Sequence, residues 1–209
     1  AGGMESMSNT PYVMTKARGG FRMGHGQVYD HMFIDGLEDA YDKGKLMGNY
    51  AEDTATHYQF TREQQDAFAI ESLTRAKKAI EDGTFAGEVV PVTFSTRKGE
   101  VTVDKDEQPL KANLEKIPLL KPAFVKDGTV TPANSSSISD GGAALVMLRR
   151  SEAEKQGLKP LALIHAHSTH AQAPEWFTTA PIDAIRKVLE RAGWDKDDVD
   201  LFEINEAFA

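Results

Sequence analysis

The sequence contains no cysteine among its 209 residues. Disulfides, thiolate metal ligands and a cysteine nucleophile are therefore excluded within the chain. The absence of cysteine fits a reducing compartment, and we expect a cytoplasmic location. The first residues, AGGMESMSN, have neither the basic nor the apolar region of a secretory signal, and they do not begin with methionine. We expect the chain to be an internal part of a longer protein.

Long apolar runs are also missing. No run approaches the roughly 20 residues that a membrane-spanning helix needs, so we expect no membrane partner. The formal net charge of -8 argues against nonspecific nucleic-acid binding, which depends on Lys and Arg neutralising phosphates. The length is sufficient for one large domain or two smaller ones, and 40% hydrophobic and 27% charged residues are typical of a globular protein.

Local signals in the first part of the sequence predict loops followed by a long helix. Residues 1–48 are rich in Gly, Met and polar side chains, and we expect loops with short helices, one of them at residues 34–41. Thr61 and Gln64 match a capping box and Gly83 is a typical helix stop. The helix between them would place four apolar residues on one face: Ala69, Leu73, Ala76 and Ile80.

A hairpin is expected after this helix. Residues 88–94 and 101–103 predict two strands joined by a turn around Lys98 and Gly99. Residues 104–121 are polar and contain proline, so they predict a surface loop.

The last third alternates between predicted strands and helices. Three apolar runs predict strands: residues 143–150, 161–166 and 199–204. Ser151 and Glu154 match a second capping box, and Gly157 would end that short helix. Pro181 and Gly193 bracket a further helix. This alternation predicts an α/β fold, preceded by an α+β insertion.

Three short patterns carry possible chemistry. In NSSSISDGGAAL, residues 134–145, the small residues and hydroxyls could admit and bind an amide-bearing ligand, or form only a polar turn. No dinucleotide fingerprint is present, since the glycines at residues 19–26 have the wrong spacing. On a strand, His165 and His167 would share a face near His170, but no third ligand can be identified. Surface histidines are favoured and no metal is expected.

Asn205 follows an apolar run and precedes an expected helix start. At the carboxyl end of a strand, its amide could hold a water molecule or donate to a developing oxyanion. Asparagine also serves well as a helix N-cap. The residue pattern leaves these two interpretations open.

Four segments resemble the thiolases, the acetyl-CoA C-acyltransferases. They are GGMESMSNTPY at residues 2–12, LMGNYAEDTA at 46–55, GTVTPANSSSISDGGAA at 128–144 and INEAFA at 204–209. Their order and separation fit that family over essentially the whole chain, with bacterial acetyl-CoA acetyltransferases the most similar members. The resemblance implies an α/β fold with a layered α-β-α-β-α core, only partly contained in this chain, and an inserted α+β loop domain.

The resemblance also implies a division of the chain. Residues 1–7 and 138–159 would belong to the N-terminal core half, and residues 160–209 would begin the C-terminal half. Residues 8–137 would form the loop domain, which binds coenzyme A (CoA). Residues 17–36 within it would make contacts in a homotetramer.

The thiolase reaction implied by the resemblance transfers an acyl group between CoA thioesters through a cysteine-bound intermediate, with no permanently bound cofactor. A second cysteine moves a proton, and a histidine and an asparagine-held water form an oxyanion hole. Of these groups the chain carries only the asparagine, Asn205. Both cysteines and the histidine would lie outside residues 1–209, and we expect the isolated chain to be inactive.

Seven residues match the family's substrate contacts. Ser136 matches the serine that touches the pantetheine arm of CoA, and six others match the lining of the acyl and pantetheine channel: Met47, Phe124, Ala207, Phe208, Leu37 and Phe177. Leu46 stands where many biosynthetic thiolases have histidine, which removes a polar contact there. No arginine is present at residues 108–116 for the nucleotide phosphates, where Lys111 is the one candidate.

A non-enzymatic CoA- or lipid-binding relative is the alternative function. A binding protein has little need of an oxyanion amide, so Asn205 within its NEAFA motif favours the enzyme. For the isolated chain we also expect exposed apolar sheet edges, which lower solubility.

Overall fold

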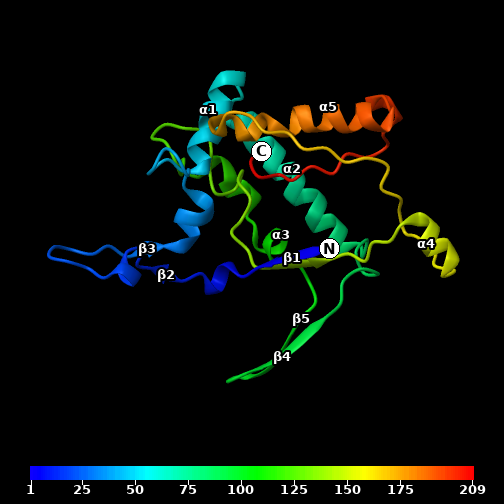
Figure 1. The fold of residues 1–209 in the computed structure, drawn as a ribbon, viewed down its shortest axis with the longest axis horizontal. Helices are drawn as coiled ribbons and strands as arrows, with labels where there is room; N and C mark the ends of the chain where they lie inside the picture. The colour runs from blue at the N-terminus through cyan, green and yellow to red at the C-terminus, as the bar shows by residue number, and fades with distance from the viewer. The chain divides into compact units, whose positions relative to one another are not determined.

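The computed structural model describes residues 1–209, and the chain forms two compact units (Figure 1). The first unit contains residues 1–54 and 137–205, and the second contains residues 55–136 and 206–209. Helix α1 (Met47–Tyr58) carries the chain from the first unit to the second.

The first unit contains three further helices and two small sheets. The strands are β1 (Gly2–Glu5), β2 (Tyr12–Val13), β3 (Tyr29–Asp30) and β6 (Gly141–Ala144). The helices are the π-helix η3 (Phe33–Leu37), α4 (Arg150–Lys155) and α5 (Ala180–Ala192), with 3-10 turns at η1 (Met7–Asn9), η2 (Ala17–Gly19), η5 (Pro174–Thr179) and η6 (Lys196–Asp198). Both sheets are antiparallel pairs, β1 with β6 and β2 with β3.

The β1–β6 pair joins the two chain segments that make up the first unit, residues 1–54 and 137–205. Gly2 lies opposite Ala144, and a Cβ atom added at Gly2 would lie 2.3 Å from the Ala143 carbonyl oxygen. Only glycine fits this register. The Ala1 ammonium group donates to the Leu145 carbonyl at 2.7 Å, and the Ser8 amide donates to Asp140 Oδ1 at 2.8 Å.

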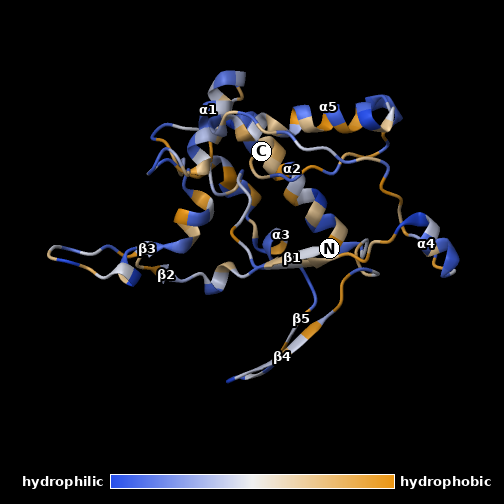
Figure 2. Ribbon diagram, viewed as in Figure 1, coloured by the Kyte–Doolittle hydropathy of each residue, from blue (hydrophilic) through white to orange (hydrophobic).

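Two predicted strands of the last third are wrong, residues 161–166 and 199–204, and the strand predicted at residues 143–150 is confirmed only at Ala143 and Ala144. Strands need neighbours for their N–H and C=O groups. Residues 143–145 pair with the start of the chain, but no strand pairs with residues 146–150, 161–166 or 199–204, and apolar side chains there lie exposed. Val146 is 97% exposed, Leu161 106% and Leu201 88%. Figure 2 shows the apolar stretch that leads from β6 to α4.

The helices of the last third are closer to the prediction. Pro181 lies in the first turn of α5, and Gly193 ends the helix with φ +69°, a left-handed conformation that favours glycine. The capping box predicted for Ser151 is wrong, because α4 begins at Arg150 without a side-chain cap. Glu154 instead accepts from Arg150 Nε at 2.8 Å. Gly157 follows the helix with φ +66°, as predicted.

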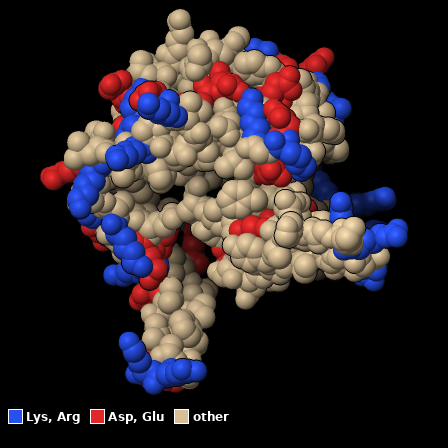
Figure 3. Space-filling view, turned by 90° about the vertical axis from the view of Figure 1, so that its left-hand side faces the viewer, with Lys and Arg blue, Asp and Glu red and all other residues tan.

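The second unit contains one long helix, a hairpin and two short helices. Its elements are α2 (Arg62–Glu81), β4 (Val92–Thr96), β5 (Gly99–Val103), α3 (Glu107–Lys111) and the 3-10 helix η4 (Leu114–Leu119). Strands β4 and β5 are antiparallel, with Phe94 opposite Val101. The hairpin prediction is confirmed, although its first strand begins at Val92. Figure 3 shows basic side chains at the end of this hairpin, where Arg97 and Lys98 form the turn.

The region predicted as a surface loop at residues 104–121 contains α3 and η4. Asp106 makes α3 possible, because its Oδ1 accepts from the Gln108 amide at 3.1 Å and so caps the first turn. The short helix predicted at residues 34–41 is confirmed only in part, since η3 ends at Leu37.

Helix α2 follows its sequence signals. Thr61 Oγ1 accepts from the Gln64 amide at 3.2 Å and Gln64 Oε1 accepts from the Thr61 amide at 2.9 Å, which confirms the capping box. Gly83 follows the helix with φ +76°. Of the four apolar residues predicted on one face, Ala69 is buried and Leu73, Ala76 and Ile80 are half-buried. Gln65 and Asp66 are buried beside Ala69. No helix of the chain is long and apolar enough to cross a membrane.

The last turn of α2 is held by Asp82. The Asp82 carboxylate accepts a hydrogen bond from Lys78 Nζ at 2.8 Å and another from the Thr84 hydroxyl at 2.5 Å. These bonds lower the pKa of Asp82 from 3.8 to about 2. Because the folded pKa is depressed, this stabilisation is present above pH 3.8 and is lost as the pH falls towards 2. We expect NMR titration of the Asp82 carboxyl carbon to give a midpoint near pH 2, and we expect that midpoint to move to higher pH in Lys78→Met. An unchanged midpoint in that variant would contradict the assignment.

Ile117 anchors η4 in the second unit. It is 3% exposed, whereas Leu119, two residues later, is 79% exposed. We expect Ile117→Ala to lower the free energy of unfolding by about 2 kcal/mol, the lower end for this change because the flanking exposed residues allow the site to collapse. Leu119→Ala should cost less than about 0.5 kcal/mol. Urea unfolding of both variants checks this, and equal losses would show that Ile117 is not a core residue.

Candidate functional site

Ser136 and the NEAFA motif lie together in the second unit. The Ser136 amide donates to the Ala207 carbonyl at 2.9 Å, and the Ala209 amide donates to the Asn134 carbonyl at 2.9 Å. These bonds form an isolated antiparallel bridge between Ser135 and Phe208. The structure therefore brings together three of the predicted substrate-binding residues, which the sequence separates by about 70 positions: Ser136, Ala207 and Phe208.

The loop before Ser136 is held by its own side chains. Asn134 Oδ1 accepts from the Thr131 amide at 2.6 Å, and its Nδ2 donates to the Thr129 carbonyl at 3.0 Å. Ser135 Oγ donates to the Thr131 carbonyl at 2.8 Å. Thr131 is 0% exposed and Asn134 2% exposed, whereas Ser136 is exposed. The hydroxyl of Ser136 can therefore reach a ligand while its backbone is fixed.

Phe124 lies on the same unit as the Ser136 bridge. The amide of the preceding residue, Ala123, donates to the Val130 carbonyl at 2.9 Å, which ties the Phe124 segment to the buried end of the serine-containing loop. Phe124 is half-buried, so part of its ring faces solvent.

The other predicted residues lie in the first unit. Met47 begins α1, where Asn49 Oδ1 accepts from the Leu46 amide at 2.8 Å. Phe177 lies in η5 and packs edge-on against Tyr50, with ring centroids 6.3 Å apart. Leu37 is the last residue of η3. All three predicted residues are half-buried.

Asn205 is exposed and lies in an extended segment. The strand predicted before it is wrong, since residues 199–204 form none. The Asn205 amide is accessible to a water molecule or a substrate.

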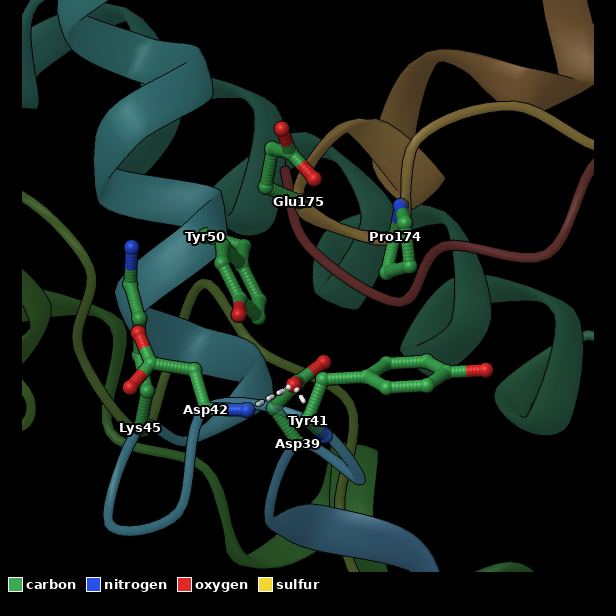
Figure 4. A pocket seen from close by; sticks show the side chains of 7 residues that line it. All are labelled: Asp39, Tyr41, Asp42, Lys45, Tyr50, Pro174 and Glu175. Carbon is green, nitrogen blue, oxygen red and sulfur yellow. Dashed lines mark hydrogen bonds between the residues drawn. The ribbon is translucent and has the colours of Figure 1, made fainter.

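A polar pocket that the sequence did not indicate lies in the first unit (Figure 4). It has a volume of 730 Å³ and is lined by Asp39, Tyr41, Asp42, Lys45, Tyr50, Pro174 and Glu175. Lys45 Nζ lies 4.2 Å from the centre of the Tyr50 ring. It also donates a hydrogen bond to Asp53 at 2.8 Å, and this bond raises the pKa of Lys45. None of the predicted substrate-binding residues lines this pocket.

Asp39 forms one wall of this pocket. Its Oδ1 accepts from the amides of Asp42 at 2.6 Å and Tyr41 at 2.8 Å, and these bonds lower the pKa of Asp39. Burial raises the pKa of Tyr50 beside it. Asp39, Asp42 and Glu175 together give the pocket an acidic lining, opposed by the single ammonium group of Lys45.

The three histidines do not form one cluster. The His165 ring lies beside the Trp194 ring, with centroids 5.3 Å apart. The His167 carbonyl accepts a hydrogen bond from Arg191 Nη1. His170 contacts Gln172 through Nε2 at 3.0 Å and Lys187 through Nδ1 at 2.8 Å. The strand that would have aligned His165 and His167 is absent, and no group of three or more His, Cys, Asp or Glu side chains is placed to hold a metal ion.

Comparison with known proteins decides the family. The family model described as the thiolase N-terminal domain matches residues 1–151. The chain belongs to the thiolase family. The model of the thiolase C-terminal domain matches residues 158–209, so both parts of a thiolase are represented.

Several relatives of this thiolase chain are named acetyl-CoA acetyltransferase. A probable acetyl-CoA acetyltransferase of Dictyostelium discoideum is 49% identical over 100% of this chain and 50% of its own length. The acetyl-CoA acetyltransferase of Rhizobium meliloti is 47% identical over 100% of this chain and 53% of its own length. An enzyme of Gibberella zeae with 48% identity is named mitochondrial. The chain spans about half the length of the curated relatives it matches.

Solved thiolase structures share the fold. The acetyl-CoA acetyltransferase from Syntrophomonas wolfei matches with a TM-score of 0.92 and 43% identity, over 99% of this chain and 52% of that one. The Bacillus anthracis enzyme matches with a TM-score of 0.89 and 43% identity, over 98% of this chain and 52% of that one. The predicted family and the thiolase-like α/β fold class are therefore confirmed.

Proposed function

We propose that this chain supplies the CoA-binding part of a thiolase that transfers acyl groups between CoA thioesters. The pairing of Ser136 with Ala207 carries the proposal, since it brings the serine that we propose to contact pantetheine together with the NEAFA residues. The substrates we propose are acetyl-CoA and acetoacetyl-CoA, or longer 3-ketoacyl-CoA thioesters, and the relatives named acetyl-CoA acetyltransferase support the first of these. No permanently bound cofactor is needed for this reaction.

Each substrate-binding residue has a proposed role. The Ser136 hydroxyl hydrogen-bonds an amide of the pantetheine arm, while the half-buried apolar side chains contact its methylene groups. The residues proposed for these apolar contacts are Ala207, Phe208, Phe124, Met47, Leu37 and Phe177. We also propose that residues 8–137 form the loop domain, that residues 1–7 and 138–159 belong to the N-terminal core half, and that residues 160–209 begin the C-terminal half. The whole protein is proposed to be a cytoplasmic homotetramer.

Asn205 is the proposed catalytic residue. Its exposed amide can hold a water molecule against the thioester oxygen, where negative charge develops during the reaction. The nucleophile must come from elsewhere, because the chain contains no cysteine. We therefore expect the isolated chain to bind CoA and to cleave no acetoacetyl-CoA.

A chimaera tests this function. The chain replaces the matched part of the Rhizobium meliloti acetyl-CoA acetyltransferase, and the remaining part of that enzyme is expected to supply the cysteines and the histidine. We expect the purified chimaera to cleave acetoacetyl-CoA with CoA, and the isolated chain to show only background. A folded chimaera that binds CoA without cleavage would instead support a non-enzymatic CoA-binding protein. Failure to bind CoA would contradict both functions.

A further inference from the structure

An ion pair between a half-buried arginine and a buried aspartate lies at the N-terminal end of α2. Arg62 Nε donates to Asp66 Oδ2 at 2.7 Å, and Arg62 Nη2 donates to the carbonyls of Ile117 at 3.0 Å and Leu120 at 2.9 Å. Asp66 is 4% exposed. A carboxylate this deeply buried is costly unless it is paired and hydrogen-bonded, so this pair needs every one of its partners.

The second oxygen of Asp66 is used by the loop that precedes Ser136. Asn134 Nδ2 donates to Asp66 Oδ1 at 3.3 Å and to the Thr129 carbonyl at 3.0 Å. Its Oδ1 accepts from the Thr131 amide at 2.6 Å. No buried side-chain polar atom of the chain lacks a partner, so this network is fully satisfied.

The network ends beside the Ser136 bridge. The Asn134 carbonyl accepts from the Ala209 amide, and the Ser136 amide donates to Ala207. Asn134 is also the last buried residue before a run of exposed ones, residues 136–151. Packing therefore cannot fix Ser136 from its C-terminal side. The hydrogen bond from Asn134 to Asp66 connects the Ser135–Ser136 side of the bridge to α2, and the Ser72 hydroxyl of α2 donates to Glu206 on the other side at 2.8 Å.

We propose that Asn134 and Asp66 are positioning residues for CoA: they fix the Ser136 and Ala207 backbones through the network that Arg62 anchors. The inference rests on the proposed function, because it assigns a ligand to the Ser136 bridge. Neither side chain touches the ligand. Removing an interaction between them lets the bridge shift and lowers CoA affinity while the Ser136 hydroxyl is unchanged.

Calorimetric titration of the 209-residue chain with CoA tests the proposal. Asn134→Asp keeps the acceptor for Thr131 but places a second carboxylate against Asp66, and we expect CoA affinity to fall about tenfold. The double variant Asp66→Asn with Asn134→Asp restores a donor between the two positions and should recover part of the loss. Asn113→Asp, at an exposed asparagine of the same unit, should leave the affinity unchanged.

Amide hydrogen exchange separates positioning from stability. In Asn134→Asp we expect the Ser136 and Ala209 amides to lose protection while the middle of α2 keeps it. Should that variant melt below the assay temperature, Asp66→Asn alone gives the same comparison, because it removes the acceptor charge and keeps the shape. If Asn134→Asp and Asp66→Asn bind CoA as tightly as the parent chain while Ser136→Ala binds it more weakly, the positioning role is overturned and the proposed function stands. An absence of CoA binding in the parent chain would overturn both.

Discussion

Replacing Asn205 with alanine should lower kcat for acetoacetyl-CoA cleavage by about 10²–10³-fold in the Rhizobium meliloti chimaera. The amide side chain is the one group of this chain placed by the proposed mechanism at the thioester oxygen. Without it, no water is held where the negative charge develops, so the transition state loses stabilisation that the ground state never had. The measurement is steady-state cleavage of acetoacetyl-CoA, with KM expected to change little.

Asn113→Ala in the same chimaera is the matched control. Asn113 is exposed and its side chain caps no helix, so kcat should stay at the parental value. An Asn205→Ala chimaera with the parental kcat and an intact fold would show that Asn205 is not catalytic. A loss confined to KM would assign Asn205 to substrate binding instead.

The second large effect concerns stability. Arg62→Leu removes three hydrogen bonds and leaves the Asp66 carboxylate buried without its cation, and we expect the second unit to lose about 3–5 kcal/mol. Arg75→Leu is the control, since Arg75 pairs with Glu71 on the same helix at the same spacing. Both of those side chains are exposed, at 78% and 58%, so their pair should contribute less than about 1 kcal/mol.

Native-state hydrogen exchange of the α2 amides measures both arginine variants. Exchange reports the stability of the unit that contains α2, so it needs no single unfolding transition for the whole chain. A large loss in Arg62→Leu and a small one in Arg75→Leu is the expected result. Equal losses would mean that burial of the Asp66 pair has no energetic consequence.

Sequence patterns predicted several of the elements that are stabilised locally, although the capping box at Ser151 was wrong and the cap of α3 at Asp106 was missed. The capping box at Thr61, the stop at Gly83 and the ends of α5 depend on residues a few positions apart, and all are confirmed. The hairpin of β4 and β5 was also predicted, because its pairing is closed by a short turn.

The failed strands depended on distant partners. Residues 161–166 and 199–204 have the composition of buried strands, but composition does not supply a neighbouring backbone. Pairing between residues far apart, as in β1 with β6, left no periodic signal in either segment. Pattern analysis could therefore recognise the apolar runs and could not determine whether they pair.

The candidate site was likewise predicted only in part from the sequence. Family resemblance indicated Ser136, Ala207 and Phe208 separately, and the structure added that the two segments are hydrogen-bonded to each other. Asp66 and Asn134 were missed. A charged residue in a helix and an amide in a polar loop are typical of exposed positions, and only the fold shows that these two are buried against each other.

An NMR titration of the isotope-labelled chain with CoA tests the central claim most directly. The account predicts saturable shifts of the Ser136, Ala207 and Phe208 amides, reduced in Ser136→Ala, with no cleavage of acetoacetyl-CoA by the same sample. Shifts absent from these amides, or confined to the polar pocket around Asp39 and Tyr50, would contradict the assignment of the Ser136 bridge as the CoA site.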